Sequence, residues 1–243
     1  MVLSRSQVDR LGERLRRGNV SDNDLRELDA YRLSFAEPYA QVVAVLRDHL
    51  GLAPTGRPAK STKSIIDKLN RESARLSQVQ DIAGCRVVAA DIMEQNSTVA
   101  AIRDRFGEVA IVDRRLRPSS GYRAVHVLVP VGNHRVEIQV RTALQHLWAE
   151  LSEKLSDRLG ITLKYGGGAA DIRAMLDEAS ALVAEVEELG EDLAGPVLGY
   201  NVVTVHPDLA AQVARLRVSQ RLHFDRTRTM LQQAIARFTA PDA

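Results

Sequence analysis

Apolar and polar residues alternate strictly over residues 136–141, the most informative periodic pattern of the chain. Because successive side chains of a strand point to opposite faces, Val136, Ile138 and Val140 are predicted to enter a core. The opposite face then carries an acid, an amide and a base, namely Glu137, Gln139 and Arg141. Such alternation alone is typical of a half-solvated antiparallel strand, so other features must decide whether these three side chains form a site.

Hydrophobic periodicity elsewhere predicts a mixed α/β chain. Two helices are expected between Asp24 and Leu50, with Pro38 starting or kinking the second, and the segment from Gly51 to Pro58 is expected to be a loop. Further helices are predicted at residues 61–76, 99–106, 144–159, 172–189 and 207–237. Strands are predicted at residues 85–91, 110–113, 124–130 and 135–141.

Two short signals define how the polar-faced strand begins and ends. Gly132-Asn133 is typical of a tight hairpin turn, which makes the strands on either side of it antiparallel. Thr142 and Gln145 have the spacing of a capping box and stand immediately before a run of helically spaced leucines. The strand is therefore expected to continue directly into an amphipathic helix.

Three segments are expected along the chain: N-terminal helices over residues 1–50, a core over residues 51–165, and a C-terminal helical extension over residues 166–243. Residues 177–192 carry seven acids and no base, which predicts an acidic outer helix face, whereas the segment after Pro207 is rich in arginine. The opposite charges suggest mutual packing or a contact between copies of the chain. Two solvated faces are the simpler interpretation.

Composition narrows the class of protein. The formal net charge of +2 over 243 residues argues against binding a bulk polyanion. Cys85, the single cysteine, lies in an apolar run and is expected to be a buried thiol in a reducing compartment. The N-terminus lacks the apolar region of a signal peptide, and no stretch has 18 consecutive apolar residues, so a cytoplasmic protein that does not contact membranes is expected.

Familiar nucleotide and metal motifs are incomplete in this sequence. Gly51 and Gly56 have the spacing of a Walker A loop, but Arg57-Pro58 follows them instead of lysine and a hydroxyl residue. The sequence has neither zinc-like spacing of cysteine and histidine nor the histidine-aspartate pair of metal phosphohydrolases. These absences favour a synthetic over a hydrolytic reaction.

Five short motifs follow one another between residues 57 and 142: Arg57-Pro-Ala-Lys60, Ser64-Ile-Ile-Asp-Lys68, Asp81-Ile-Ala-Gly-Cys-Arg86-Val87, Gly121-Tyr-Arg-Ala-Val-His126 and Glu137-Ile-Gln-Val-Arg-Thr142. In this order they resemble the RelA/SpoT synthetase family, whose members make guanosine tetra- and pentaphosphate. The resemblance covers about residues 40 to 165 and is that of a small, stand-alone member. It implies an α/β (α+β) fold with a mixed sheet, a nucleotidyltransferase-like synthetase domain flanked by N- and C-terminal helices.

The resemblance also implies a role for each matching residue. Asp81 and Glu137 match the catalytic acids that bind Mg²⁺. The residues expected at ATP are the cations of the first three motifs, namely Arg57, Lys60, Lys68 and Arg86. The residues expected on the acceptor side are Tyr122, on which the base stacks, together with His126, Gln139 and Arg141. Arg117 is expected there as well, as a source of positive charge and not as a match.

The chemistry itself needs these residue types. Moving the β,γ-pyrophosphate of ATP to a ribose 3′-hydroxyl requires a metal on the phosphate oxygens, cations for the developing charge and a base near the hydroxyl, a part that Glu137 could also take. Lys60, Ser64 and Lys68 are four residues apart, so a helix would place them on one face. An exposed, solvated face is the alternative for these lysines.

Departures from the family pattern concern mainly the acceptor. Arg57 and Lys60 are separated by one extra residue, so Lys60 is the firmer match. The loop over residues 116–122 lacks the family's lysine and the asparagine beside the glycine, although Arg114, Arg115 and Arg117 can supply charge. Three acceptors therefore stay open: GDP or GTP, which lead; the 3′ end of tRNA, as in toxin-type relatives; and an adenine nucleotide. A homo-oligomer is expected, and a neutralising antitoxin stays open as a further partner. A catalytically silent regulatory module is the minor alternative to an enzyme.

Overall fold

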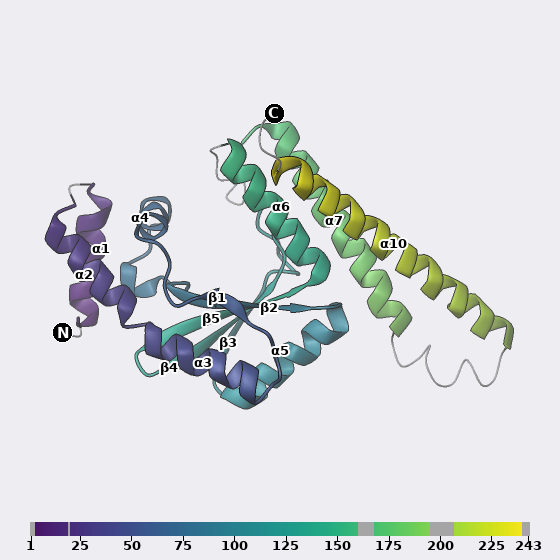
Figure 1. Ribbon diagram of the computed structural model, residues 1–243, viewed down its shortest axis with the longest axis horizontal. Coiled ribbons are helices and arrows are strands. Elements are labelled where there is room, and N and C mark those ends of the chain that lie inside the picture. The colour runs from purple at the N-terminus through teal and green to yellow at the C-terminus, as the bar shows by residue number, and fades with distance from the viewer. Residues whose placement is uncertain (1–2, 19, 160–167, 195–206, 240–243) are drawn as a thin grey trace. The chain divides into compact units, whose positions relative to one another are not determined.

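Five strands form one sheet in the order β1-β2-β5-β4-β3 (Figure 1). The strands are β1 (Thr55–Arg57), β2 (Ala83–Ala89), β3 (Ala110–Asp113), β4 (Val125–Val131) and β5 (His134–Thr142). The computed structural model describes residues 3–18, 20–159, 168–194 and 207–239 of the chain. The predicted mixed α/β architecture is confirmed.

The chain divides into two compact units. The first comprises Met1–Val87, Val99–Val112 and His126–Gln139. It contains the whole sheet except for the ends of some strands. The second comprises Val88–Thr98, Asp113–Val125 and Val140–Ala243. The predicted division into three consecutive segments stays a prediction, and its boundary after residue 165 lies outside the described residues.

The first unit contains the N-terminal helices α1 (Arg5–Arg16), α2 (Asp22–Leu33), α3 (Ala36–Asp48) and α4 (Thr62–Arg71), and the short helix η1 (Leu76–Gln78). The two helices expected between residues 24 and 50 are α2 and α3, and Pro38 lies in the first turn of α3. The prediction of one helix over 61–76 is wrong: α4 stops at Arg71 because the backbone of Glu72 is extended. The expected loop over 51–58 contains strand β1.

Strand β1 exists because glycine lets it approach its neighbour. Gly56 lies opposite Cys85 in the antiparallel pair of β1 with β2. A Cβ atom at Gly56 would lie 2.6 Å from the Cα of Cys85, a separation that real side chains do not reach. Cys85 itself is buried, as expected, and burial raises the pKa of its thiol to about 12.

The β4–β5 hairpin is confirmed, with Gly132 and Asn133 in the turn between the two strands. Val136, Ile138 and Val140 of β5 are fully buried, as their alternation predicts. The opposite face of the strand is not half-solvated, because Glu137 is only 8% exposed. A buried carboxylate needs a partner charge, a hydrogen-bond donor or a metal, so this face of β5 is a candidate site.

In the second unit, α6 (Ala143–Leu159), α7 (Ala170–Ala194) and α10 (Pro207–Thr239) run alongside one another (Figure 1). Leucines and valines of the three helices form one core around Trp148. None of the helices among the described residues is long and apolar enough to cross a bilayer. The long helix α5 (Ile92–Phe106) contributes residues to both units.

The start of α6 has the predicted capping box. The backbone N–H of Gln145 donates to Thr142 Oγ1 at 3.1 Å, and that of Thr142 donates to Gln145 Oε1 at 3.2 Å. Glu187 of α7 accepts hydrogen bonds from the side chains of both residues and is buried. The prediction that the acids of residues 177–192 form an outer face is therefore wrong for Glu187, whose burial raises its pKa.

Candidate active site

Asp81 forms ion pairs with two lysines in the first unit. Lys60 Nζ lies 2.6 Å from its Oδ2 atom and Lys68 Nζ lies 2.8 Å from its Oδ1 atom. Burial alone would raise the pKa of Asp81, but the charges and hydrogen bonds of the lysines outweigh it and lower this pKa to about 2. Asp81 is therefore a carboxylate at neutral pH, with two ammonium groups directly beside it.

Backbone hydrogen bonds, rather than a helix, place Lys60. It precedes the N-cap of α4, so the predicted shared helix face is wrong for this residue, although its ammonium does converge with that of Lys68. The N–H of Lys60 donates to the carbonyl of Ile82 at 2.7 Å, and Arg32 Nε donates to the carbonyl of Lys60 at 2.7 Å. These two bonds hold Lys60 next to Ile82, the residue that follows Asp81 in the sequence.

Glu137 is the second carboxylate of the first unit. His126 Nδ1 lies 2.9 Å from its Oε1 atom, and Gln139 Nε2 donates to its Oε2 atom at 2.8 Å. Burial raises the pKa of Glu137, whereas the contacts with His126 and Gln139 lower it, and the net direction is downward. Glu137 is thus a buried, ionised carboxylate, and each of its two oxygens contacts a neighbouring side chain.

One face of the sheet presents the cations of β1 and β2 together with Glu137. Arg57 lies opposite Gly84, and residues opposite one another in an antiparallel pair point to the same side. Arg86, two residues after Gly84 on β2, shares that side. A Cβ atom at Gly84 would lie 3.5 Å from the Cβ of Glu137, so these residues share a face with the carboxylate.

Tyr122 and Arg141 contact each other in the second unit. Arg141 Nη2 donates to the Tyr122 hydroxyl at 3.1 Å, and its guanidinium carbon lies 5.1 Å from the centre of the ring. Arg141 is 5% exposed, so this end of β5 also keeps a charged group away from solvent. Tyr122 is half-buried at the end of a tight turn.

That turn is built from two residues with positive φ. Ser120 has φ 49° and Gly121 has φ 78°, and the N–H of Tyr122 donates to the carbonyl of Ser119 at 3.0 Å. Two positive φ angles in succession are those of a type I′ turn, which favours asparagine followed by glycine. Ser120 therefore has the backbone of the asparagine that the resemblance leads one to expect, without its amide.

The loop arginines differ in what they contact. Arg115 is held by Asp113, with its Nη2 atom 2.6 Å from Oδ2, and by the side chains of Gln95 and Asn96. Arg117 is exposed to solvent. Of these two, Arg115 is held within the loop, whereas the role of Arg117 toward the acceptor stays a prediction.

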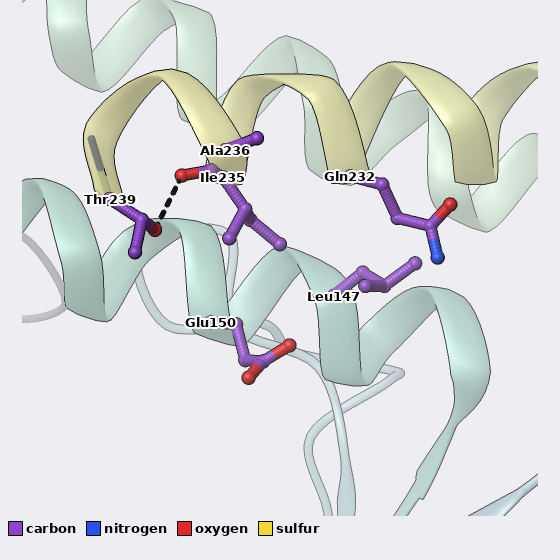
Figure 2. Close-up of a pocket in the computed structure, with 6 residues that line it drawn as sticks. All are labelled: Leu147, Glu150, Gln232, Ile235, Ala236 and Thr239. Atoms are coloured by element: carbon purple, nitrogen blue, oxygen red, sulfur yellow. Dashed lines mark hydrogen bonds between the residues drawn. The ribbon is translucent and has the colours of Figure 1, made fainter.

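A separate pocket lies between α6 and α10, as Figure 2 shows. Leu147, Ile235 and Ala236 supply apolar surface, with Glu150 and Gln232 at its edges. None of the residues predicted to act on ATP or the acceptor lines it. The open apolar groove therefore gives no support to a phosphate site.

Sequence reasoning missed Arg32 and Gly84. Arg32 lies on α2 and holds the backbone of Lys60, and no motif marks a surface arginine of a distant helix for such a contact. Gly84 stands inside the Asp81 motif, which by itself assigns the glycine no role. A Cβ atom at Gly84 would lie 3.1 Å from the carbonyl oxygen of Glu137, a tight contact, so glycine eases the approach of β2 to Glu137. A lone glycine within a strand pattern is a signal for such a close approach.

Comparisons with known proteins agree with the sequence motifs. A family model described as a region found in RelA / SpoT proteins matches residues 56–156. Rv1366 of Mycobacterium tuberculosis is 40% identical over 145 residues, which cover 56% of this chain and 52% of that protein, so the match spans about half the length of this relative. GTP pyrophosphokinase YjbM of Bacillus subtilis is 30% identical over 162 residues, covering 59% of this chain and 72% of the relative.

The fold agrees as well. The crystal structure of small alarmone synthetase 1 from Bacillus subtilis superposes with a TM-score of 0.52 at 26% identity, over 73% of this chain and 98% of that one. The predicted synthetase-type fold, a mixed sheet with flanking helices, is confirmed by this match. The chain belongs to the RelA/SpoT family.

Proposed function

We propose that this protein transfers the β,γ-pyrophosphate of ATP to the 3′-hydroxyl of GDP or GTP. The observation that carries the proposal is the convergence of Lys60 and Lys68 on Asp81. Two ammonium groups beside an ionised carboxylate can bind the oxygens of a polyphosphate and a cation that bridges them. The relative named GTP pyrophosphokinase supports the same reaction.

Asp81 and Glu137 are suited to hold Mg²⁺. The ion is usually bound in proteins by one or two carboxylates together with substrate phosphates, and both acids have pKa values lowered from the ordinary range. When bound, Mg²⁺ neutralises charge on the phosphate oxygens. The lysines, for their part, exchange some of their contact with Asp81 for contact with phosphate, since an ammonium group has three donors.

The lowered pKa of Glu137 favours the metal-ligand role over that of a general base. A base is most effective when its pKa lies near the working pH, whereas a carboxylate with a lowered pKa accepts a proton poorly. His126 and Gln139 hold both oxygens of the carboxylate and so orient it. Glu137 is therefore assigned to the metal in preference to the proton.

Tyr122 and Arg141 are assigned to the acceptor nucleoside. A half-buried ring backed by a guanidinium offers a flat surface on which a base can stack, and stacking does not depend on base identity. Selectivity for guanine then has to come from hydrogen bonds to the base edge. Ser120 provides a hydroxyl where the family has an amide, which leaves the tRNA end and adenine nucleotides as alternative acceptors.

A labelling assay tests the proposal. The protein with Mg²⁺ and γ-labelled ATP is incubated separately with GDP, GTP, unlabelled ATP or deacylated tRNA, and the products are separated. Label in a guanosine nucleotide supports the leading assignment. Label in tRNA alone replaces it with the toxin-type reaction, and the absence of label from every acceptor leaves the regulatory module.

The two lysines give a specific prediction. We expect Lys60→Ala and Lys68→Ala each to raise the KM for ATP, or to lower kcat, by about tenfold, because each removes a charge-assisted contact to phosphate. Lys63→Ala is the matched control, since Lys63 is exposed on α4. If both test variants match the control in ATP titrations, the lysines serve only to neutralise Asp81.

The acceptor side gives a second prediction. We expect Tyr122→Ala to raise the KM for the acceptor about tenfold or more, because loss of stacking removes about 1 to 3 kcal/mol per base. Tyr122→Phe should be mild, because it keeps the ring and loses only the hydroxyl that Arg141 contacts. Steady-state kinetics with each acceptor measures both, and an unaffected Tyr122→Ala variant removes the stacking role.

A further inference from the structure

Ser180 of α7 joins the C-terminal helices to the turn that carries Tyr122. Its hydroxyl donates to the carbonyl of Gly121 at 2.6 Å and accepts from Arg123 Nε at 3.1 Å. The serine is 3% exposed, so water does not readily replace these bonds. One buried hydroxyl thus contacts the residues immediately before and after the tyrosine.

The same turn packs against Trp148 of α6. A Cβ atom at Gly121 would lie 2.7 Å from Cζ2 of the indole and 3.2 Å from the Cβ of Ser180. The indole is fixed in turn, because its Nε1 donates to the carbonyl of Leu176 on α7 at 2.8 Å. The absence of a side chain at Gly121 therefore lets the turn lie directly on α6 and α7.

Arg123 connects Ser180 to Arg115, near the other end of the loop. Its Nη1 atom donates to the carbonyl of Arg115 at 2.7 Å, while Nε donates to Ser180. Arg115 is itself held by Asp113 and by Gln95. The segment from Asp113 to Arg123 is thus held at both ends, and Ser180 is its contact on α7.

We infer that Ser180 is a positioning residue that fixes the Tyr122 turn, so that α7 of the C-terminal extension sets how well the acceptor nucleoside is bound. The inference rests on the proposed acceptor role of Tyr122. The energetic reason is preorganisation: a ring already held in place loses less conformational freedom when a base stacks on it. Loss of the serine hydroxyl therefore acts on the acceptor and leaves ATP binding as it is.

The test compares Ser180→Ala with Ser152→Ala. Ser152 is a matched control because it is a buried serine of α6, 2% exposed, whose hydroxyl has no hydrogen-bond partner in the described part of the chain. Both variants are measured by steady-state kinetics with the acceptor and ATP varied in turn. Trp148 is the single tryptophan of the chain, so acrylamide quenching of its fluorescence reports whether the turn still covers it.

The expected result for Ser180→Ala is a KM for the acceptor raised about fivefold, an unchanged KM for ATP and stronger quenching of Trp148, with Ser152→Ala like wild type. Gly121→Ala serves as a second variant and should show the same pattern more strongly, since a side chain there meets Trp148 and the φ of 78° is strained.

Quenching equal to wild type in both test variants overturns the inference, as does an equal rise in the two KM values. If wild type transfers no pyrophosphate, the proposed function fails on that result alone. The quenching experiment needs no turnover and still decides whether Ser180 holds the turn, so the two failures are distinguishable.

Discussion

We expect the Glu137→Gln variant to lose pyrophosphate transfer by about a thousandfold or more while it keeps its fold. The substitution preserves volume and removes one charge at a position where the carboxylate is enclosed and ionised. If Glu137 binds the metal, an uncharged amide is a much poorer ligand, and the charge that develops on the phosphates is left unbalanced. The loss is expected in kcat at saturating Mg²⁺.

Glu187→Gln provides a matched control for losing a buried carboxylate. Glu187 is as enclosed as Glu137, at 8% exposed, and accepts hydrogen bonds from Thr142 and Gln145 in the second unit. The Glu187→Gln variant should lose some stability and keep kcat within about threefold. The partners of Glu187, Thr142 and Gln145, are not among the residues proposed to bind Mg²⁺, ATP or the acceptor. A Glu137→Gln variant with more than about a tenth of the wild-type rate would remove the metal assignment.

Local patterns predicted the parts of the fold that depend on neighbouring residues. The hairpin at Gly132-Asn133 and the capping box at Thr142 require only residues close in sequence, and both are present. The same kind of local signal marks the start of α1, since Ser4 and Gln7 form a capping box before the buried residues Val8, Leu11 and Leu15. Residues 1–50 were expected to be helical, but no separate helix was predicted before Asp24.

Elements that depend on contacts distant in sequence were predicted less well. β1 is three exposed residues long and exists only through its pairing with β2, so its own sequence carries no strand pattern. Helix α4 was extended past Arg71 because Leu76 continues the helical spacing, although that leucine belongs to a separate short helix. Periodicity alone does not show where a backbone turns between two helical stretches.

For the candidate site, the residue types were predictable and their arrangement was not. The motifs gave Lys60, Lys68 and Asp81, and the structure brings the three together. The reason offered for Lys60 was wrong, because backbone bonds to Ile82 and from Arg32 place it, and neither is visible in a periodic pattern. The roles of these residues toward ATP and metal stay predictions until the variants are measured.

Asp81→Asn is expected to abolish transfer and also to destabilise the fold in a pH-dependent way. The two ammonium groups beside Asp81 are largely buried, with 11% and 18% of their side chains exposed, and without the carboxylate they repel each other. We expect a loss of about 2 kcal/mol in the free energy of unfolding near neutral pH. Asp67→Asn is the control, since Asp67 is exposed on α4 and should change neither activity nor stability.

The pH dependence follows from the lowered pKa of Asp81. Because the folded protein holds this pKa at about 2, below the value of 3.8 for an unperturbed aspartate, the stabilisation is fully present above about pH 4 and is lost as the pH falls toward 2. Wild type should therefore exceed Asp81→Asn in denaturant stability at pH 6, and the gap should narrow progressively below pH 4. A gap that is constant from pH 6 to pH 2.5 would show that the ion pairs with Lys60 and Lys68 do not stabilise the fold, whatever part the carboxylate takes in catalysis.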